Sequence, residues 1–422
     1  MTESNDREAL RAREQGVAET YERAMAVGLE LDMTRGKPSP KQLDLANDIL
    51  ALPGITEYRD SEGADCRNYG GLDGLPRMRR LFGEILGCPA ENVIIGGNSS
   101  LTIMHDTIVR AFLWGVPGGK APWGKQGNVK FLCPVPGYDR HFAVTQHVGI
   151  DMLNVGMTDA GPDMDQVEAL AKDPLVKGIW CVPKYSNPTG VTYSDEVVER
   201  LAKMEAATDF RIMWDNAYAE HHLSDDHDRL ANMFDACRKA GNEDRLLMFA
   251  SSSKMSFAGA GVAAMAASMT NVRDTKKHLS MQTIGPDKVN QLRHLKFFGD
   301  IHGLRAHMSR QAEIIRPKFE LVQNVLGREL GGKGIASWSN PKGGYFIDLN
   351  VPDGCAKDVV ALAAEAGVKL TKAGATFPQG QDPRDRNIRL APTLPSLDEI
   401  KDAMKVLAIC VELSSVRKQL AG

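Results

Sequence analysis

Residues 246–254 read Leu-Leu-Met-Phe-Ala-Ser-Ser-Ser-Lys and give the clearest indication of the architecture. Five apolar residues in a row predict a short strand that is covered on both faces of a sheet. Three hydroxyl residues and then Lys254 follow where this strand is expected to end. Most lysines lie in solvent, so a lysine beside a buried strand is unusual. Lys254 is therefore either an ordinary surface residue or a functional one.

Short apolar runs also occur at residues 93–95, 129–132, 178–182 and 211–214, and helical patterns separate them. Strands that alternate with helices predict βαβ units and a mostly parallel sheet. Because these strands are almost entirely apolar, helices are expected to cover both faces of the sheet. The sequence thus predicts a large α/β domain over residues 51–300.

The pattern changes after about residue 285. A long charged helix is expected over residues 300–330, an antiparallel hairpin around 343–349, and helices over 356–366 and 396–413. These elements predict a smaller α+β domain over residues 301–422.

The N-terminal region has a different character. Residues 4–30 show the pattern of a polar helix, and Pro38 favours an extended chain in the residues before it. Residues 1–50 are therefore expected to form a helix and an extended arm that belong to the small domain.

Composition limits the classes of function. The 422 residues are 43% hydrophobic and 25% charged, with a formal net charge of −3, which is typical of a folded protein in solution. This charge gives no reason to expect nucleic acid as a partner. No apolar run is long enough to span a membrane, and the polar start carries acidic residues that a secretory signal lacks. A cytoplasmic protein is therefore expected.

Cysteine and histidine patterns indicate neither disulfides nor a metal site. The seven cysteines are scattered and never occur at C-x-x-C spacing, so they are expected to be buried free thiols in a reducing compartment. His221 and His222 form the only adjacent histidine pair, and no third ligand is evident near them. No metal is expected.

Polar residues follow several of the predicted strands, where ligands of open α/β sheets bind. Gly96-Gly97-Asn98-Ser99-Ser100 precedes a helix and suits either a plain helix cap or an anion site. Asn187 lies in an Asn-Pro-Thr-Gly segment that can be an ordinary turn. Asp215 and Tyr218 follow the strand at 211–214, where an acid often just caps a helix. A desolvated Lys254 with a lowered pKa would suit imine chemistry.

Taken in order, four motifs resemble the class I aspartate aminotransferase family of pyridoxal 5'-phosphate (PLP) enzymes, fold type I. They are Asn187-Pro-Thr-Gly, Asp215-x-x-Tyr218, Ser-x-Ser-Lys254 and Arg389 near the C-terminus. Each motif is weak alone, but their order and spacing together are specific, and the resemblance covers about residues 30–415. Residues 32–38 and 133–141 are similar to the subgroup related to MocR-type aminotransferase domains.

The resemblance implies a set of residues that hold PLP. Lys254 would carry the cofactor as an imine and move the reacting proton. Asp215 would pair with the pyridine nitrogen, Asn187 and Tyr218 would donate to the phenolate oxygen, and Tyr138 would stack on the ring. The phosphate would be held by helix N–H groups and hydroxyls, which belong to Ser99, Ser100, Ser251, Ser253 and, from the partner of a homodimer with shared active sites, Tyr69.

The resemblance also implies where a substrate binds. Arg389 would take the α-carboxylate as a bidentate pair, beside Asn187 and Gly36. Arg35, Lys37 and Lys288 are candidates for a side-chain carboxylate. The sequence departs from many relatives at Val262, where they place an arginine that grips the phosphate.

These resemblances imply a homodimeric aminotransferase that moves an amino group from an amino acid, with aspartate favoured, to 2-oxoglutarate by a ping-pong mechanism. A β-lyase or decarboxylase on the same fold is an alternative, because the residues do not fix which bond of the substrate breaks. A PLP-sensing regulatory domain is an alternative of another class. Against it, only about 30 residues precede the core and the net charge is acidic.

Overall fold

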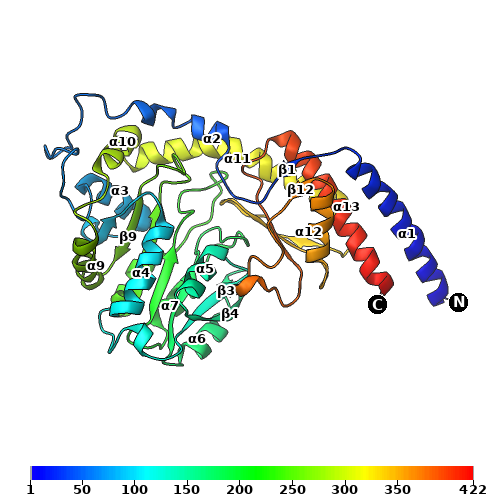
Figure 1. The fold of residues 1–422 in the computed structure, drawn as a ribbon, viewed down its shortest axis with the longest axis horizontal. Coiled ribbons are helices and arrows are strands. Elements are labelled where there is room, and N and C mark those ends of the chain that lie inside the picture. The colour runs from blue at the N-terminus through cyan, green and yellow to red at the C-terminus, as the bar shows by residue number, and fades with distance from the viewer. Residues whose placement is uncertain (1, 422) are drawn as a thin grey trace.

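An eight-stranded, mostly parallel sheet forms the centre of the larger part of the molecule (Figure 1). The computed structural model describes residues 2–421. The strand order is β2-β9-β8-β7-β6-β3-β4-β5, and the five strands from β8 to β4 run parallel to one another. The strands are β2 (Val93–Ile95), β3 (Lys130–Val135), β4 (Asp151–Thr158), β5 (Gly161–Pro162), β6 (Val176–Cys181), β7 (Arg211–Asp215), β8 (Leu246–Ser251) and β9 (Ala263–Ala267).

The five apolar runs of the sequence all form strands, but β4, β5 and β9 were not predicted. Strand β9 is Ala-Ala-Met-Ala-Ala, and alanine is depleted in strands, so its sequence carries no strand signal. It pairs antiparallel with both β2 and β8, which cover its edges. Its small side chains are buried because helices pack over both faces of the sheet.

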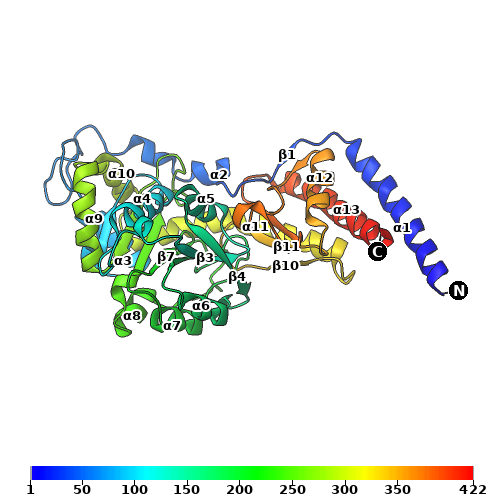
Figure 2. The ribbon, with the colours of Figure 1, turned by 60° about the horizontal axis from the view of Figure 1, so that its bottom comes forward.

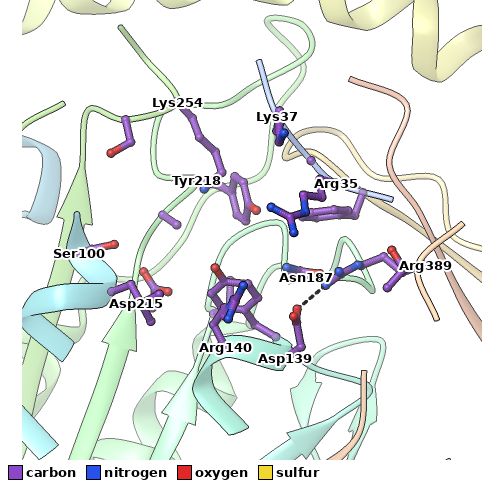
Figure 3. A pocket seen from close by; sticks show the side chains of 18 of the residues that line it. Arg35, Lys37, Ser100, Asp139, Arg140, Asn187, Asp215, Tyr218, Lys254 and Arg389 are labelled. Carbon is purple, nitrogen blue, oxygen red and sulfur yellow. Dashed lines mark hydrogen bonds and ion pairs between the residues drawn. The ribbon is translucent and has the colours of Figure 1, made fainter. Parts of the chain in front are cut away.

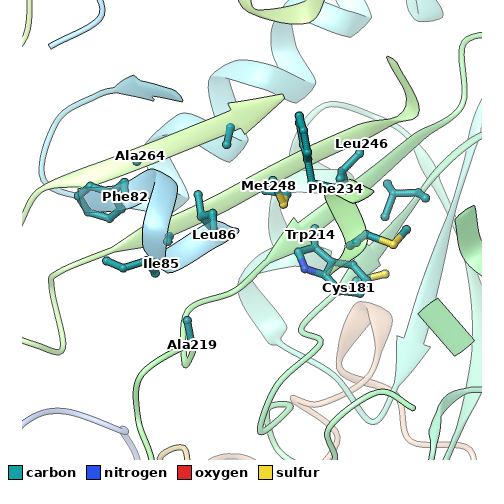
Figure 4. Packing of buried hydrophobic residues seen from close by; sticks show 14 of the residues in the cluster. Phe82, Ile85, Leu86, Cys181, Trp214, Ala219, Phe234, Leu246, Met248 and Ala264 are labelled. Carbon is teal, nitrogen blue, oxygen red and sulfur yellow. The ribbon is translucent and has the colours of Figure 1, made fainter. Parts of the chain in front are cut away.

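Side chains of successive strand residues enter two separate cores, as the alternation of a pleated strand requires. Trp214 and Met248 face a core that includes Phe82, whereas Met213 and Phe249 face the core on the other side of the sheet. Figure 4 shows the first of these cores, where Phe82 and its neighbours from α3 lie near Met248. The first core is covered by α3 (Pro76–Leu86), α6 (Met164–Ala171), α7 (Asp195–Lys203), α8 (Met233–Lys239) and α10 (Lys288–Phe298), and the second by α4 (Ser100–Trp114), α5 (Asp139–His147) and α9 (Met269–Gln282).

A third core forms around a small antiparallel sheet of order β10-β11-β13. The predicted hairpin around 343–349 was placed too early, since only its last residues lie in β11 and residues 343–346 belong to the loop before it. The C-terminal helix runs to Ala421, beyond the predicted end at 413. The elements are α11 (Ile301–Leu330), β10 (Ser337–Trp338), β11 (Ile347–Asn350), α12 (Ala356–Glu365), β12 (Val368–Lys369), β13 (Asn387–Leu390) and α13 (Leu397–Ala421).

The N-terminal arm packs on this C-terminal part. Helix α1 (Thr2–Met25) lies against α13, as both ribbon views show (Figures 1 and 2). Strand β1 (Leu31–Asp32) pairs in parallel with β12, and α2 (Pro40–Asp44) follows it toward the large sheet. The arm therefore connects the C-terminal part with the part that contains the large sheet. The boundaries of the domains remain a prediction.

Among residues 2–421, no helix is both long and apolar enough to cross a lipid bilayer. All seven cysteines are free and six of them are buried, as the sequence predicted.

Candidate active site

The ends of the central strands, the N-terminal arm and the small sheet together line one cavity of about 630 Å³. Polar residues from segments far apart in the sequence meet there (Figure 3). Of the predicted site residues, only Tyr69 and Lys288 lie outside the lining. The structure brings together Gly36, Arg35, Lys37, Ser99, Ser100, Tyr138, Asn187, Asp215, Tyr218, Ser251, Ser253, Lys254 and Arg389.

Lys254 lies just beyond the carboxyl end of β8 and points into the cavity (Figure 3). Its Nζ is 5.0 Å from the centre of the Tyr218 ring. The surrounding protein removes water from the amine, which lowers the pKa of Lys254, and the nearby Asp215 carboxylate partly opposes this effect. A lysine in this environment has a larger fraction of neutral, nucleophilic amine than a surface lysine.

Asp215 is the last residue of β7 and is almost fully buried. Its Oδ2 lies 3.0 Å from Nε2 of His141, whose ring stacks on Trp180 with a centroid distance of 4.3 Å. Its Oδ1 is buried and has no hydrogen-bond partner within the described residues. A buried carboxylate oxygen without a partner is costly, so this atom fits a protonated ring nitrogen of a bound cofactor.

Two residues of the same cavity, Tyr218 and Asn187, supply neutral polar groups. Tyr218 is buried, and the loss of solvation raises its pKa well above the usual value, so its hydroxyl keeps its proton. Asn187 is also buried, in the loop that follows β6, and its Oδ1 is 3.4 Å from Nη1 of Arg389. Tyr138 lies edge-on to His141, with a centroid distance of 4.9 Å, below the same part of the cavity.

Four serines surround the start of α4. Ser99 precedes this 15-residue helix, and its hydroxyl does not cap it, while Ser100 is the first helical residue. Ser251 ends β8, and Ser253 donates from Oγ to the carbonyl of Asn98 at 2.9 Å, which joins the two loops. Free N–H groups at a helix start with several hydroxyls suit a phosphate.

The four serines and the start of α4 form a candidate phosphate cradle. Val262 faces away from this cradle. Its side chain is buried in the apolar core near α3 and α10, and its N–H donates to Oγ of Ser252 at 2.9 Å. The structure thus places no cation at this position, and the serines and helix α4 make up the cradle.

Arg389 approaches the cavity from β13 of the small sheet. Its Nη1 donates to Oδ1 of Asp139 at 2.7 Å, and its guanidinium carbon is 5.0 Å from the centre of the Phe346 ring. Phe346 also explains why residue 36 is a glycine, because a Cβ at this position would lie 2.5 Å from the end of the Phe346 ring. Glycine therefore lets the arm pass close to the small sheet at the cavity.

Sequence reasoning missed several residues of this cavity. Asp139 and Arg140 begin α5 and line the cavity, and His141 lies outside the lining but contacts Asp215; single charged residues on a helix carry no signal of their own. Lys372 follows β12 and also lines the cavity. Within the described chain, Arg35, Lys37, Arg140 and Lys372 form no ion pair, as the salt bridges of residues 2–421 show.

Two predicted residues lie elsewhere. Lys288, a candidate for a substrate carboxylate, lies outside the cavity lining and donates to the carbonyls of Tyr69 and Gly70 at 3.0 and 2.8 Å. Its amine is therefore used to hold a loop. Tyr69 lies in that loop and is 84% exposed. Within residues 2–421, no group of three or more His, Cys, Asp or Glu side chains is arranged to hold a metal ion.

A half-buried lysine, an unpaired buried carboxylate oxygen and a buried arginine at the strand ends of an α/β fold together define an enzyme active site. The sequence matches the family described as aspartate amino-transferase over residues 4–422. The chain therefore belongs to the aspartate aminotransferase family.

Relatives cover almost the whole chain. A Mycolicibacterium smegmatis protein, provisionally named an aminotransferase, is 51% identical and covers 99% of both chains. An aspartate aminotransferase of Corynebacterium glutamicum is 45% identical over 97% of this chain and 95% of its own. The crystal structure of an aspartate transaminase from the same species superposes with a TM-score of 0.96, covering 97% of each chain at 45% identity. The protein is thus an aminotransferase, and the predicted PLP-dependent transferase fold type I is confirmed.

Proposed function

We propose that the protein binds PLP and moves an amino group from aspartate to 2-oxoglutarate by a ping-pong mechanism. The observation that carries this proposal is the unpartnered Oδ1 of Asp215 in the same cavity as the half-buried amine of Lys254. When bound, PLP acts as an electron sink for the substrate's α-carbon. A β-lyase or a decarboxylase would use the same two residues, so product analysis must separate these reactions.

Each polar residue has a task that its environment supports. Lys254 attaches the cofactor and then carries a proton at Nζ, for which a lowered pKa is favourable. Oδ1 of Asp215 keeps the ring nitrogen protonated, while His141 holds Oδ2. Tyr218 stays a hydroxyl donor because its pKa is raised. Arg389 binds the α-carboxylate of the amino acid and of the oxo acid.

The charge of the cavity supports a substrate with two carboxylates. Besides Lys254, the lining contains five cations and two carboxylates, which leaves a positive surplus for a phosphate and a dicarboxylate. These residues are Arg35, Lys37, Arg140, Lys372 and Arg389, with Asp139 and Asp215. The named activity of the C. glutamicum relative supports aspartate as the donor.

Half-reactions test this proposal directly. Holoenzyme mixed with aspartate alone is expected to yield one equivalent of oxaloacetate per site, and added 2-oxoglutarate is then expected to yield glutamate. The side-chain carboxylate should make kcat/KM for aspartate at least about 100-fold higher than for alanine, which corresponds to about 3 kcal/mol of charge-assisted binding. Equal values for aspartate and alanine would refute the dicarboxylate preference. Release of ammonia or carbon dioxide would instead indicate a lyase or a decarboxylase.

We also propose that a second copy of the chain completes the site, with Tyr69 reaching the partner's phosphate cradle. The loop that carries Tyr69 packs against the chain at Gly285, since a Cβ there would lie 2.6 Å from the carbonyl of Gly70. The two segments carry large exposed apolar side chains, which is typical of an interface. These are Ile55, Tyr69, Met281 and Ile284.

The free cysteines support a cytoplasmic site of action.

Replacing Tyr69 with phenylalanine is expected to raise the dissociation constant for PLP by roughly 10-fold, because one hydrogen bond to a charged group is lost. Equilibrium dialysis after removal of the cofactor measures this change. Tyr58→Phe alters a tyrosine of the same loop that stacks on Arg67, and this control should keep the original affinity. Sedimentation should give twice the chain mass for all three proteins. A monomer that binds PLP with full affinity would contradict the shared site.

A further inference from the structure

The ion pair between Asp139 and Arg389 lies inside the proposed substrate site. Figure 3 shows the two side chains pointing toward each other beside Asn187, with the contact drawn as a dashed line. The carboxylate Oδ1 of Asp139 is 2.7 Å from Nη1 of Arg389, although the two residues are 250 positions apart in the chain. The protein thus presents a carboxylate of its own to the group that is proposed to bind the substrate's α-carboxylate.

Arg389 has few other partners. Its side chain is 8% exposed, and its Nε is buried without a hydrogen-bond partner in the described chain. Nη1 also reaches the Oδ1 of Asn187, but at the long distance of 3.4 Å. A buried guanidinium without an anion is strongly unfavourable, since its lost solvation is not replaced. Asp139 supplies that anion.

Asp139, in contrast, can give up this contact at little cost. It is the first residue of α5, where the helix dipole stabilises a negative charge, and its side chain is 35% exposed. Arg389 is its one hydrogen-bonding partner within residues 2–421. A carboxylate that turns away from Arg389 therefore regains water and keeps the favourable helix terminus. The two partners differ, because Arg389 needs an anion in the cavity and Asp139 does not need a cation.

We propose that Asp139 is an internal competitor for the substrate's α-carboxylate. It neutralises Arg389 while no substrate is bound and yields the guanidinium when an amino acid or an oxo acid enters. This inference rests on the proposed role of Arg389. Because every substrate and product of the reaction has an α-carboxylate, the competition weakens the binding of all of them and promotes product release. Asp139 does not touch the reacting atoms and is a positioning residue.

A different role for Asp139 makes the opposite prediction. If the carboxylate were a fixed brace that orients Arg389 for the substrate, its removal would weaken the binding of carboxylates. If it is a competitor, its removal strengthens their binding. The sign of one measured change therefore separates the two roles.

Calorimetric titration of the holoenzyme with succinate and with propanoate, neither of which has an amine to transfer, tests the proposal. Asp139→Asn keeps the shape of the side chain and removes its charge. We expect the dissociation constants of both carboxylates to fall roughly 2- to 5-fold, the range for a solvent-accessible ion pair. The KM values for aspartate and 2-oxoglutarate should fall in parallel, without a rise in kcat. An unchanged or raised dissociation constant overturns the proposal.

Two further variants locate the effect. Asp195→Asn removes an exposed carboxylate from the first residue of α7, a matched helix start outside the cavity, and should leave binding unchanged. In an Arg389→Gln background, Asp139→Asn should no longer strengthen the binding of succinate. If Arg389→Gln alone binds succinate as tightly as the unaltered protein, the role of Arg389 in the proposed function fails, and the inference fails with it. If Arg389→Gln loses binding while Asp139→Asn has no effect, only the inference fails.

Discussion

Replacing Lys254 with alanine is expected to abolish transamination, with a loss in kcat of at least about 10³-fold, because one side chain supplies both the covalent attachment and the proton carrier. Nζ lies in the cavity, 5.0 Å from the Tyr218 ring, and burial lowers its pKa. No other group of comparable basicity is positioned at the end of β8 within the described residues. The absorbance of the lysine-bound cofactor should disappear as well. Single-turnover reactions with aspartate and a spectrum of the purified protein measure the two effects.

Lys184 provides a matched control for this experiment. It is also a buried lysine near a strand end, and loss of solvation lowers its pKa too, but its Nζ donates to the carbonyl of Ala219 and lies outside the cavity lining. Lys184→Met should therefore keep the absorbance of the lysine-bound cofactor. A Lys254→Ala protein that retained this absorbance, or transaminated at the original rate, would refute the assignment.

The sequence located the strand-end residues well for a physical reason. Parallel strands bring their carboxyl ends to one edge, so the polar residue that ends each apolar run must lie near the others. Asp215 ends β7, whereas Lys254 and Asn187 lie in the loops that follow β8 and β6, and all three line the cavity. The sequence did not predict strand β9, because alanine has little strand preference and the strand's place in the sheet comes from pairing with β2 and β8.

The same reasoning could not find the residues whose role depends on distant contacts. Asp139 matters because β13 places Arg389 beside it, although the two residues are 250 positions apart in the sequence. The sequence near residue 139 gives no sign of this contact. From the sequence, His141 is only a histidine on a helix. Its link to the site comes from its stacking on Trp180 and its contact with Asp215. Lys288 was misjudged for the converse reason, since the loop carbonyls that bind its amine are more than 200 positions away.

Asp215→Asn is expected to produce the second large loss of activity. The substitution preserves shape and removes the charge that Oδ1 offers to the ring nitrogen, in an environment that is 2–3% exposed for both Asp215 and His141. Removing one partner of a buried charged pair costs about 3–5 kcal/mol. If that cost falls on the transition state, kcat decreases by roughly 10²- to 10⁴-fold. Rapid mixing of the holoenzyme variant with aspartate measures the rate of the first half-reaction.

Asp209 shows whether that loss is specific to the active site. It is another buried aspartate with a cationic partner, Lys177 at 2.9 Å, but it precedes β7, whereas Asp215 ends that strand. Asp209→Asn should therefore lower the free energy of unfolding and leave the first half-reaction of the folded protein at its original rate. Asp215→Asn should instead leave the free energy of unfolding unchanged and slow the first half-reaction. The reason is that Oδ1 has no partner in the protein to lose and its charge acts on the bound cofactor. If the two variants slowed the half-reaction equally, Asp215 would be a structural residue, and the unpartnered oxygen would no longer support a cofactor at this position.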